Sequence, residues 1–295
     1  MFMRPISFSK IGSILIVFFS IFGSLPARAF SFEEHPCTKC HLEFTEPSKS
    51  VHAIPKSGCQ ACHMLVEGKN HPEQKDSIRL LQDIPALCYT CHDKAIFIGK
   101  SFHPLIVTAK CTVCHNPHQS NFDKLLIKDM PSLCYNCHNE SRFQGKFVHS
   151  PVGKGLCLSC HSAHASNFSS ILIKGVPDIC FTCHSKDQFT GKYVHPIAIV
   201  PNGCNLCHDP HVSGYPHLLS KSINEVCINC HKKNETGRHI VSSLPRGMVH
   251  PIKGVQDPSN PLREMSCISC HNPHSSKFPK LYTSARICRR CHPQY

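Results

Sequence analysis

The chain has 295 residues, of which 24 are His and 22 are Cys, with no Trp and a formal net charge of +13 at pH 7. Twenty-three Pro and 15 Gly interrupt it, and no long stretch carries a helical or strand period. This composition argues against a self-sufficient doubly wound sheet, barrel or helix bundle and predicts that something other than side chains fills the interior.

Residues 1–29 have the pattern of a removable export signal. Arg4 and Lys10 give a positive start, and a mostly apolar run of 15 residues follows. Ala27-Arg28-Ala29 then supplies a small-x-small cleavage site. The alternative is a membrane anchor, but the run is shorter than the roughly 20 residues that span a bilayer. The sequence predicts cleavage after Ala29 and export to the periplasm or the cell surface.

A basic chain is typical of proteins that bind nucleic acid or acidic lipid. Removal of the export signal still leaves a formal charge of +10. Export argues against nucleic acid, and the Lys and Arg are scattered along the chain rather than gathered in a stripe. The positive charge therefore needs another use.

Every Cys belongs to a Cys-x-x-Cys-His motif, and eleven such motifs, numbered here in chain order, use all 22. The Cys pairs are Cys37 and Cys40, Cys59 and Cys62, Cys88 and Cys91, Cys111 and Cys114, Cys134 and Cys137, Cys157 and Cys160, Cys180 and Cys183, Cys204 and Cys207, Cys227 and Cys230, Cys267 and Cys270, and Cys288 and Cys291. The motif His residues are His41, His63, His92, His115, His138, His161, His184, His208, His231, His271 and His292. This pattern predicts eleven haem c groups, each held by two thioethers with the motif His as proximal iron ligand.

Two other uses of paired Cys explain less. A disulfide framework accounts for an even number of Cys but not for a His after every pair. Zinc sites built from two Cys-x-x-Cys pairs would leave the His without a role, and eleven pairs do not divide into such sites. With haem, the basic side chains offset the propionates, of which each haem brings two.

The motifs recur at a near-constant spacing of 23 residues through the middle of the chain. The true repeat is two motifs, about 46 residues, and copies begin with Phe-x-Gly-Lys at Phe97, Phe143 and Phe189. Motifs 9 and 10 are instead 40 residues apart. That stretch predicts a loop or a seam between haem groups.

Thirteen His remain as candidates for the distal iron position. Nine recur at fixed places, either upstream of the first motif of a unit or three residues past a proximal His: His52, His103, His118, His149, His164, His195, His211, His250 and His274. His71 and His35 are less regular candidates, and His217 and His239 are further alternatives for the eleventh iron. Met, the competing ligand, occurs only at unmatched places in the repeat. The pattern favours bis-His, low-potential haems.

His118 lies only three residues after His115, a reach of about 10 Å even when extended. It cannot readily lie on the opposite face of the iron that His115 binds. We therefore expect His118 to ligate a different haem and to tie two macrocycles together.

The unit Val/Phe-His…Cys-x-x-Cys-His-x-Pro-His…Leu-Leu…Cys-x-x-Cys-His closely resembles the doubled Cys-x-x-Cys-His family of multihaem c-type cytochromes, most clearly over residues 88–231. The resemblance implies short helices and loops wrapped around a stacked haem chain, working in periplasmic or extracellular electron transfer. It is typical of periplasmic donors, outer-membrane conduits and filament-forming cytochromes. The expected division is a signal peptide (1–29), an N-terminal haem region (30–92), regular repeats (93–236) and a stretched C-terminal unit (237–295).

The sequence predicts an electron carrier rather than an enzyme, exchanging electrons with redox protein partners. One alternative is a subunit of an extracellular filament. Another is a reductase with one open haem, which the surplus of His disfavours. Association with an outer-membrane porin is a third, and any membrane crossing would then be borrowed from that partner.

Overall fold

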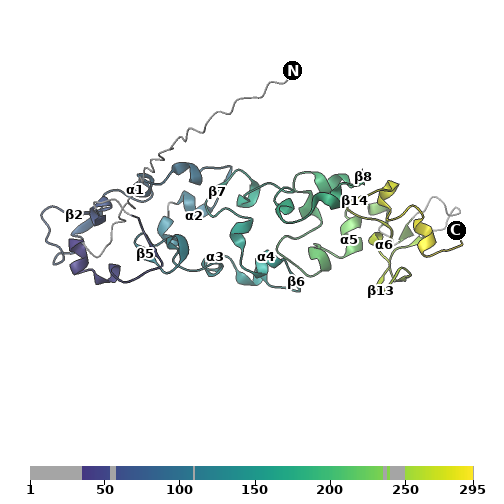
Figure 1. The fold of residues 1–295 in the computed structure, drawn as a ribbon, viewed down its shortest axis with the longest axis horizontal. Coiled ribbons are helices and arrows are strands. Elements are labelled where there is room, and N and C mark those ends of the chain that lie inside the picture. Colours follow the sequence, from purple (N-terminus) through teal and green to yellow (C-terminus); the bar gives the residue numbers. More distant parts are fainter. Residues whose placement is uncertain (1–34, 54–57, 109, 235–237, 240–249, 295) are drawn as a thin grey trace, which may run out of the picture.

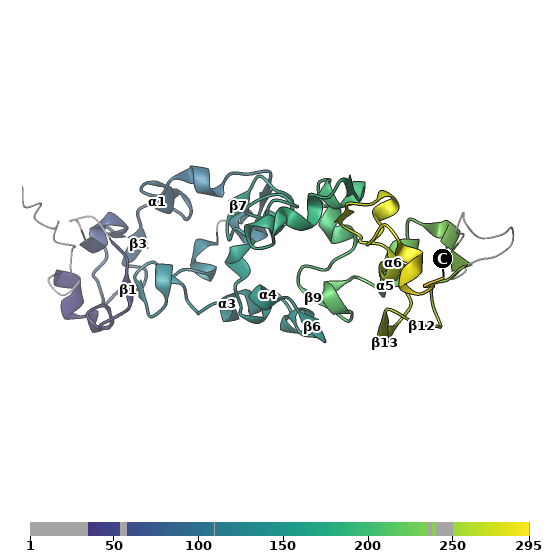
Figure 2. The ribbon, with the colours of Figure 1, turned by 45° about the vertical axis from the view of Figure 1, so that its right-hand side comes forward.

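The structure is a computed structural model, described here for residues 35–53, 58–108, 110–234, 238–239 and 250–294. The expected export signal lies outside these residues. The described chain forms a long rod along which the sequence runs from one tip to the other (Figure 1). A second view at 45° shows the same extended arrangement (Figure 2). Within the described part of the chain, no helix has the length and apolar character needed to cross a bilayer.

In the described residues, regular secondary structure consists of very short elements. The α-helices are α1 (Ala86–Tyr89), α2 (Pro104–Val107), α3 (Ser132–Tyr135), α4 (Ser150–Gly153), α5 (Ile223–Ile228) and α6 (Cys267–Cys270). The strands are β1 (Ser50–Val51), β2 (His63–Leu65), β3 (Ile78–Leu80), β4 (Ser101–Phe102), β5 (Gln119–Ser120), β6 (Phe147–Val148), β7 (Ala165–Ser166), β8 (Tyr193–Val194), β9 (Val212–Ser213), β10 (Arg238–His239), β11 (His250–Pro251), β12 (Gln256–Asp257), β13 (Asn260–Glu264) and β14 (Ser275–Ser276). Short 3-10 helices connect them.

Each motif coincides with one short helical turn. The 3-10 helices over motifs are η2 (Pro36–Lys39), η4 (Gly58–Ala61), η6 (Cys111–Val113), η9 (Cys157–Ser159), η11 (Cys180–Thr182), η14 (Gly203–Leu206) and η18 (Ile287–Arg290), and α1, α3, α5 and α6 cover the others. In ten motifs the N–H of the final His donates to the carbonyl of the first Cys at 2.9–3.0 Å. The turn therefore presents two thiols and one imidazole from five consecutive residues.

Two-residue antiparallel ladders join each repeat to the next. We call an even-numbered motif, the odd-numbered motif after it and the His that precedes them a unit. The ladders are β1–β5, β4–β7, β6–β9 and β8–β14, and each pairs the strand beside the leading His of one unit with a strand of the following unit. These ladders thus connect each unit with its neighbours in the rod, as in other repeat proteins.

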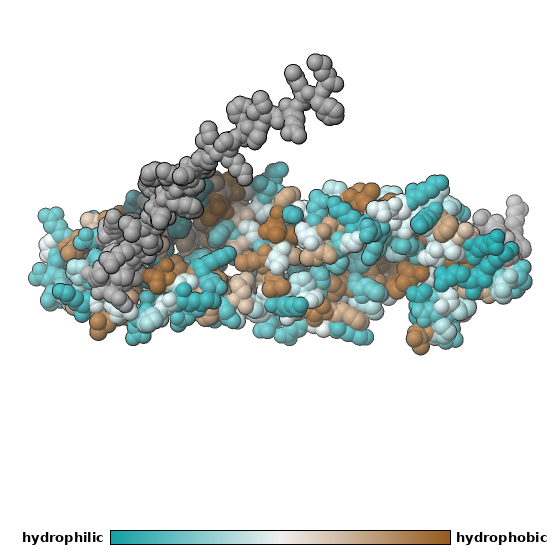
Figure 3. Space-filling model, in the orientation of Figure 1, coloured by the Kyte–Doolittle hydropathy of each residue, from teal (hydrophilic) through white to brown (hydrophobic). Residues whose placement is uncertain are grey.

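Side chains alone build very little core. Among the described residues, the buried apolar side chains are Val176, Ile179, Ala198, Ile252 and Met265. A cavity of about 3920 Å³ extends along the rod from motif 1 to the region of His211, and every Cys and His of motifs 1 to 7 lines it. Apolar residues on the surface are scattered among polar ones (Figure 3). The predicted fold class, short helices and loops in repeats of about 46 residues, is confirmed.

Candidate haem sites

Each of the eleven motif His faces one other His across the interior. The ring centroids of every pair are 5.9–6.3 Å apart. With the motif His first, the pairs are His41 with His71, His63 with His118, His92 with His52, His115 with His164, His138 with His103, His161 with His211, His184 with His149, His208 with His274, His231 with His195, His271 with His239, and His292 with His250.

This spacing fits one metal ion between two imidazoles. A metal bound at about 2 Å by a nitrogen of each ring separates the two ring centroids by roughly 6 Å. The angle between ring planes ranges from 18° to 86°. Such a range is compatible with ligation, because rotating one ring about the shared nitrogen–metal axis changes this angle without moving the nitrogen. The cysteines of each turn stand beside the same site, so the residues present fit haem c.

Backbone carbonyls orient four of the motif rings. The Nδ1–H groups of His115, His161, His208 and His271 donate to carbonyls nine residues further along, at 2.7–2.9 Å. A metal-binding His characteristically uses its second nitrogen in this way, which fixes the ring and leaves Nε2 for the metal. The sites are thus set up by the local turn as well as by the motif.

These carbonyls also explain His217. The acceptors are Lys124, Ser170, His217 and Lys280, each in a left-handed turn with φ between 55° and 58°. His217 therefore occupies a repeat position that other units fill with Lys or Ser. Its backbone oxygen, which any residue type would provide, accepts the bond from His208. Nothing in this position requires an imidazole.

Burial favours the metal-binding form of seven of the facing rings. It lowers the pKa of His52, His103, His118, His164, His195, His211 and His274, with neighbouring His adding to the effect. The neutral imidazole is the iron-binding species. The Phe of the Phe-x-Gly-Lys repeat packs on some of these rings, with Phe97 and His164 centred 4.8 Å apart and Phe189 and His274 4.9 Å apart.

The cysteines place the motifs in one continuous line. Burial and the neighbouring Cys111 thiol raise the pKa of Cys88. The first Cys of motif 3 therefore lies close to the first Cys of motif 4. Burial and the Cys137 thiol raise the pKa of Cys114. The second Cys of motif 4 is therefore near the second Cys of motif 5. The same two electrostatic interactions between neighbouring thiols alternate along the rod: Cys37 with Cys59, Cys62 with Cys91, Cys134 with Cys157, Cys160 with Cys183, Cys180 with Cys204, Cys207 with Cys230, Cys227 with Cys267, and Cys270 with Cys291. The spatial order of the sites is the order of the motifs in the sequence.

The facing rings follow a rule that alternates with motif number. An odd-numbered motif from 3 onward faces the His that leads its own unit, as His92 faces His52. Motifs 2, 4, 6 and 8 face a His from the following unit, as His63 faces His118 at 6.0 Å. His118 thus faces His63 and not the adjacent His115, whose ring faces His164.

The two ends of the rod depart from the regular pattern. At motif 1, His41 faces His71 at 6.0 Å, while His35 lies beside attachment thiols, with its Nδ1 3.5 Å from Cys59 Sγ. At motif 10, His271 faces His239. All nine regularly spaced His and His71 thus lie opposite motif His. His239, only a further alternative in the sequence, is the eleventh.

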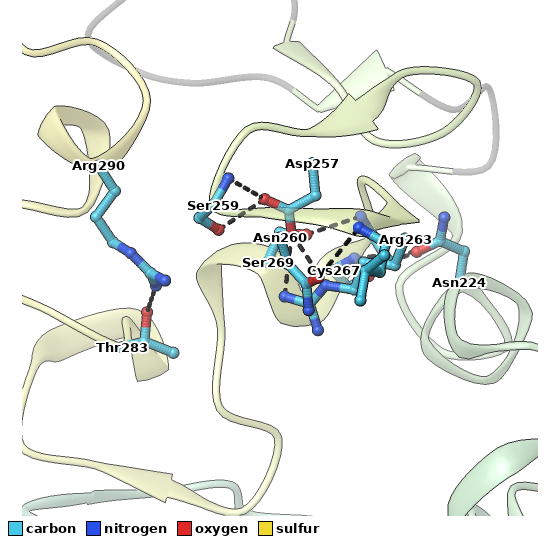
Figure 4. Close-up of polar contacts among 11 residues, drawn as sticks. Asn224, Asp257, Ser259, Asn260, Arg263, Cys267, Ser269, Thr283 and Arg290 are labelled. Carbon is cyan, nitrogen blue, oxygen red and sulfur yellow. Dashed lines mark hydrogen bonds and ion pairs between the residues drawn. The ribbon is translucent and has the colours of Figure 1, made fainter.

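Sequence reasoning missed a buried carboxylate behind motif 10. Asp257 is fully buried and accepts from the Ser259 backbone N–H at 2.9 Å, from Ser259 Oγ at 2.6 Å and from Ser269 Oγ at 2.6 Å (Figure 4). Arg263 adds Nε at 3.1 Å and Nη2 at 3.0 Å. Ser269 lies inside motif 10, between Cys267 and Cys270. Asp257 therefore ties the loop before the motif to the motif itself.

We expect stability around motif 10 to depend on pH through Asp257. Burial raises the pKa of Asp257, but hydrogen bonds from Ser259, Ser269 and Arg263 outweigh it and hold the pKa below the usual value. A depressed folded-state pKa contributes stability above the unfolded pKa of about 4, which is lost as the pH falls toward the folded pKa. Asp257→Asn should cost about 1–3 kcal/mol at neutral pH and flatten this dependence, measured by amide exchange over residues 256–272. The exposed Asp178→Asn is the control. An unchanged acid profile in Asp257→Asn would contradict the assignment.

Tight turns that each present two thiols and an imidazole, repeated along a rod, define a multihaem c-type cytochrome with covalently bound haem c. The family model of the doubled CXXCH motif matches residues 52–97, 103–143, 149–189, 198–236 and 260–295, more than half of the chain. The chain belongs to this family. The matched segments contain motifs 2 to 11. No curated protein matches the chain.

Proposed function

We propose that the protein carries electrons along eleven covalently bound haems, each ligated by two His. The observation that supports this most directly is the set of eleven ring pairs at 5.9–6.3 Å. Haem c supplies the ferric–ferrous couple, and His at both axial positions favours low potentials. The eleven motif His are the proximal ligands and the facing His the distal ligands. For the eleventh site His239 replaces His35.

Two axial His on every iron favour a carrier over a reductase. Reduction of a substrate at haem needs an iron position that the substrate can occupy. The protein's contribution here is to hold each pair of imidazoles, to favour the neutral form of seven facing rings by burial, and to orient four of the motif rings through backbone carbonyls. These roles set potentials and prevent ligand exchange, which is what electron transfer without bond chemistry requires.

The order of the sites supports end-to-end transfer. Neighbouring thiols of consecutive motifs interact in one series from motif 1 to motif 11, and these two motifs lie near opposite tips of the described rod (Figure 1). Electrons entering near one tip would leave near the other. The partners we propose are redox proteins outside the cytoplasm, in the periplasm or at the cell surface, including a porin-bound cytochrome complex.

The rod shape also favours a second candidate, a subunit of an end-to-end filament, because a haem near each tip suits transfer between copies. Electron microscopy of the purified holoprotein over a wide concentration range distinguishes the two. Discrete rods throughout would support the carrier, whereas filaments would support assembly.

Intact mass and low-temperature electron paramagnetic resonance test the proposed ligation together. We expect the mass of eleven haems per chain and only low-spin ferric signals in the oxidised protein. The reason is that two imidazoles give a strong ligand field at every iron. One stoichiometric high-spin signal would reveal an open iron and favour a reductase.

A further inference from the structure

We propose that residues 238–239 and 250–265, named here the closing segment, supply motif 10 with the distal ligand that other even-numbered motifs receive from the next unit. The proposal rests on the bis-His ligation proposed above. It assigns His239 as the iron ligand opposite His271, and it gives a physical reason for the 40-residue spacing between motifs 9 and 10.

In the regular units, a ladder between two units places two distal His side by side. Ser50 pairs with Ser120 and Val51 with Gln119, so that His52 stands opposite His118, and the His52 N–H donates to the His118 carbonyl at 2.9 Å. The same backbone bond joins His103 to His164, His149 to His211 and His195 to His274 at 2.8–2.9 Å. In each case the first His faces an odd-numbered motif and the second an even-numbered motif.

The closing segment produces the same arrangement of two distal His without a following unit. β10 pairs with β11 in antiparallel register, with His239 directly opposite His250. His250 leads unit 5 and faces His292 of motif 11, as the rule for odd-numbered motifs requires. His239 therefore occupies the place of the donor from a following unit, and its ring lies 6.1 Å from that of His271.

Other contacts fasten the segment to motif 10 from both sides. Asn224 of α5 donates through Nδ2 to the Ile252 carbonyl at 2.8 Å and accepts at Oδ1 from the Cys267 N–H at 3.0 Å. Ile252 and Met265 are two of the few buried apolar side chains. Asp257 then bonds Ser269 inside the motif. This local core gives the ligand a fixed platform, since the described residues contain no ladder between β10 and another unit.

A direct consequence concerns the source of the ligand. The second His of motif 10 comes from the same molecule, so neither a further repeat nor a neighbouring copy is needed to complete this iron. Each of the eleven motif His then has its partner ring within one chain.

His239→Ala tests the assignment in the full-length holoprotein. We expect one high-spin ferric haem per chain by electron paramagnetic resonance, with the remaining haems low-spin, and return of that haem to low-spin on addition of imidazole. His217→Asn is the matched control, because Asn tolerates the left-handed turn and its carbonyl still accepts from His208; it should stay fully low-spin. A His239→Ala protein without a high-spin haem would overturn the proposal.

A second variant tests the proposal if the His239→Ala protein does not fold or does not incorporate its haems. His239→Met keeps a sixth ligand, and we expect one haem to gain the charge-transfer band of Met ligation and a higher reduction potential. Absence of both changes counts against His239. The wild-type spin state should also be independent of dilution, since a high-spin signal that grows on dilution would mean that a neighbouring copy supplies the ligand. High-spin iron in the undiluted wild type would instead contradict bis-His ligation itself.

Discussion

Replacing His118 by Met should raise the reduction potential of the haem attached at Cys59 and Cys62, by on the order of 0.1 V out of the roughly 0.8 V that axial ligation spans. The His118 ring faces His63 of that site at 6.0 Å. A thioether stabilises ferrous iron relative to an imidazole, which raises the potential. Potentiometry gives the shift, and cryo-electron microscopy of the variant identifies the iron that the Met binds.

His164→Met is the matched variant, because the His164 ring faces His115 and so affects the haem attached at Cys111 and Cys114. The two variants should therefore change different haems, although His118 follows His115 by only three residues. A shift at the Cys111–Cys114 haem in the His118 variant would contradict donation between units.

Gly191→Ala should loosen the joint between units 4 and 5 at the β8–β14 ladder by about 1–3 kcal/mol, the usual effect of overpacking. A Cβ at Gly191 would lie 2.7 Å from the Ser276 backbone nitrogen and 2.8 Å from Ser275 Oγ. The same ladder holds His274 opposite His208. We therefore expect a lower denaturant midpoint and a fraction of high-spin iron at the Cys204–Cys207 haem.

Gly214→Ala provides the control, because a Cβ there meets no atom within 4 Å. Its unfolding midpoint and spin state should match the wild type. Equal destabilisation by both substitutions would show that the loss comes from backbone propensity rather than from close approach at the ladder.

Much of the haem-binding machinery is local and therefore readable from the sequence. Five consecutive residues form each attachment turn, closed in ten of the eleven motifs by a bond from the His N–H to the carbonyl of the first Cys, so no distant contact decides it. Repetition also identified the nine regularly spaced His, because each recurs with the same spacing to a motif.

The pairing of the rings depends instead on contacts between segments that are distant in the sequence. Whether His118 faces His63 or another motif depends on the register of β1 with β5, which joins residues about seventy positions apart. The closing segment repeats no motif, so only the β10–β11 register brings His239 opposite His250, beside motif 10. Asp257 likewise has no sequence signal, since its partners come from the turn after β12, from β13 and from α6.

The sequence by itself determined the attachment chemistry, the number of motifs and the repeat, because covalent attachment and a short turn are properties of neighbouring residues. The tertiary structure alone decided which His meets which motif and how motif 10 obtains its partner. The physical reason is that these choices are made by two-residue ladders and a few buried contacts between segments, whose register no local periodicity encodes.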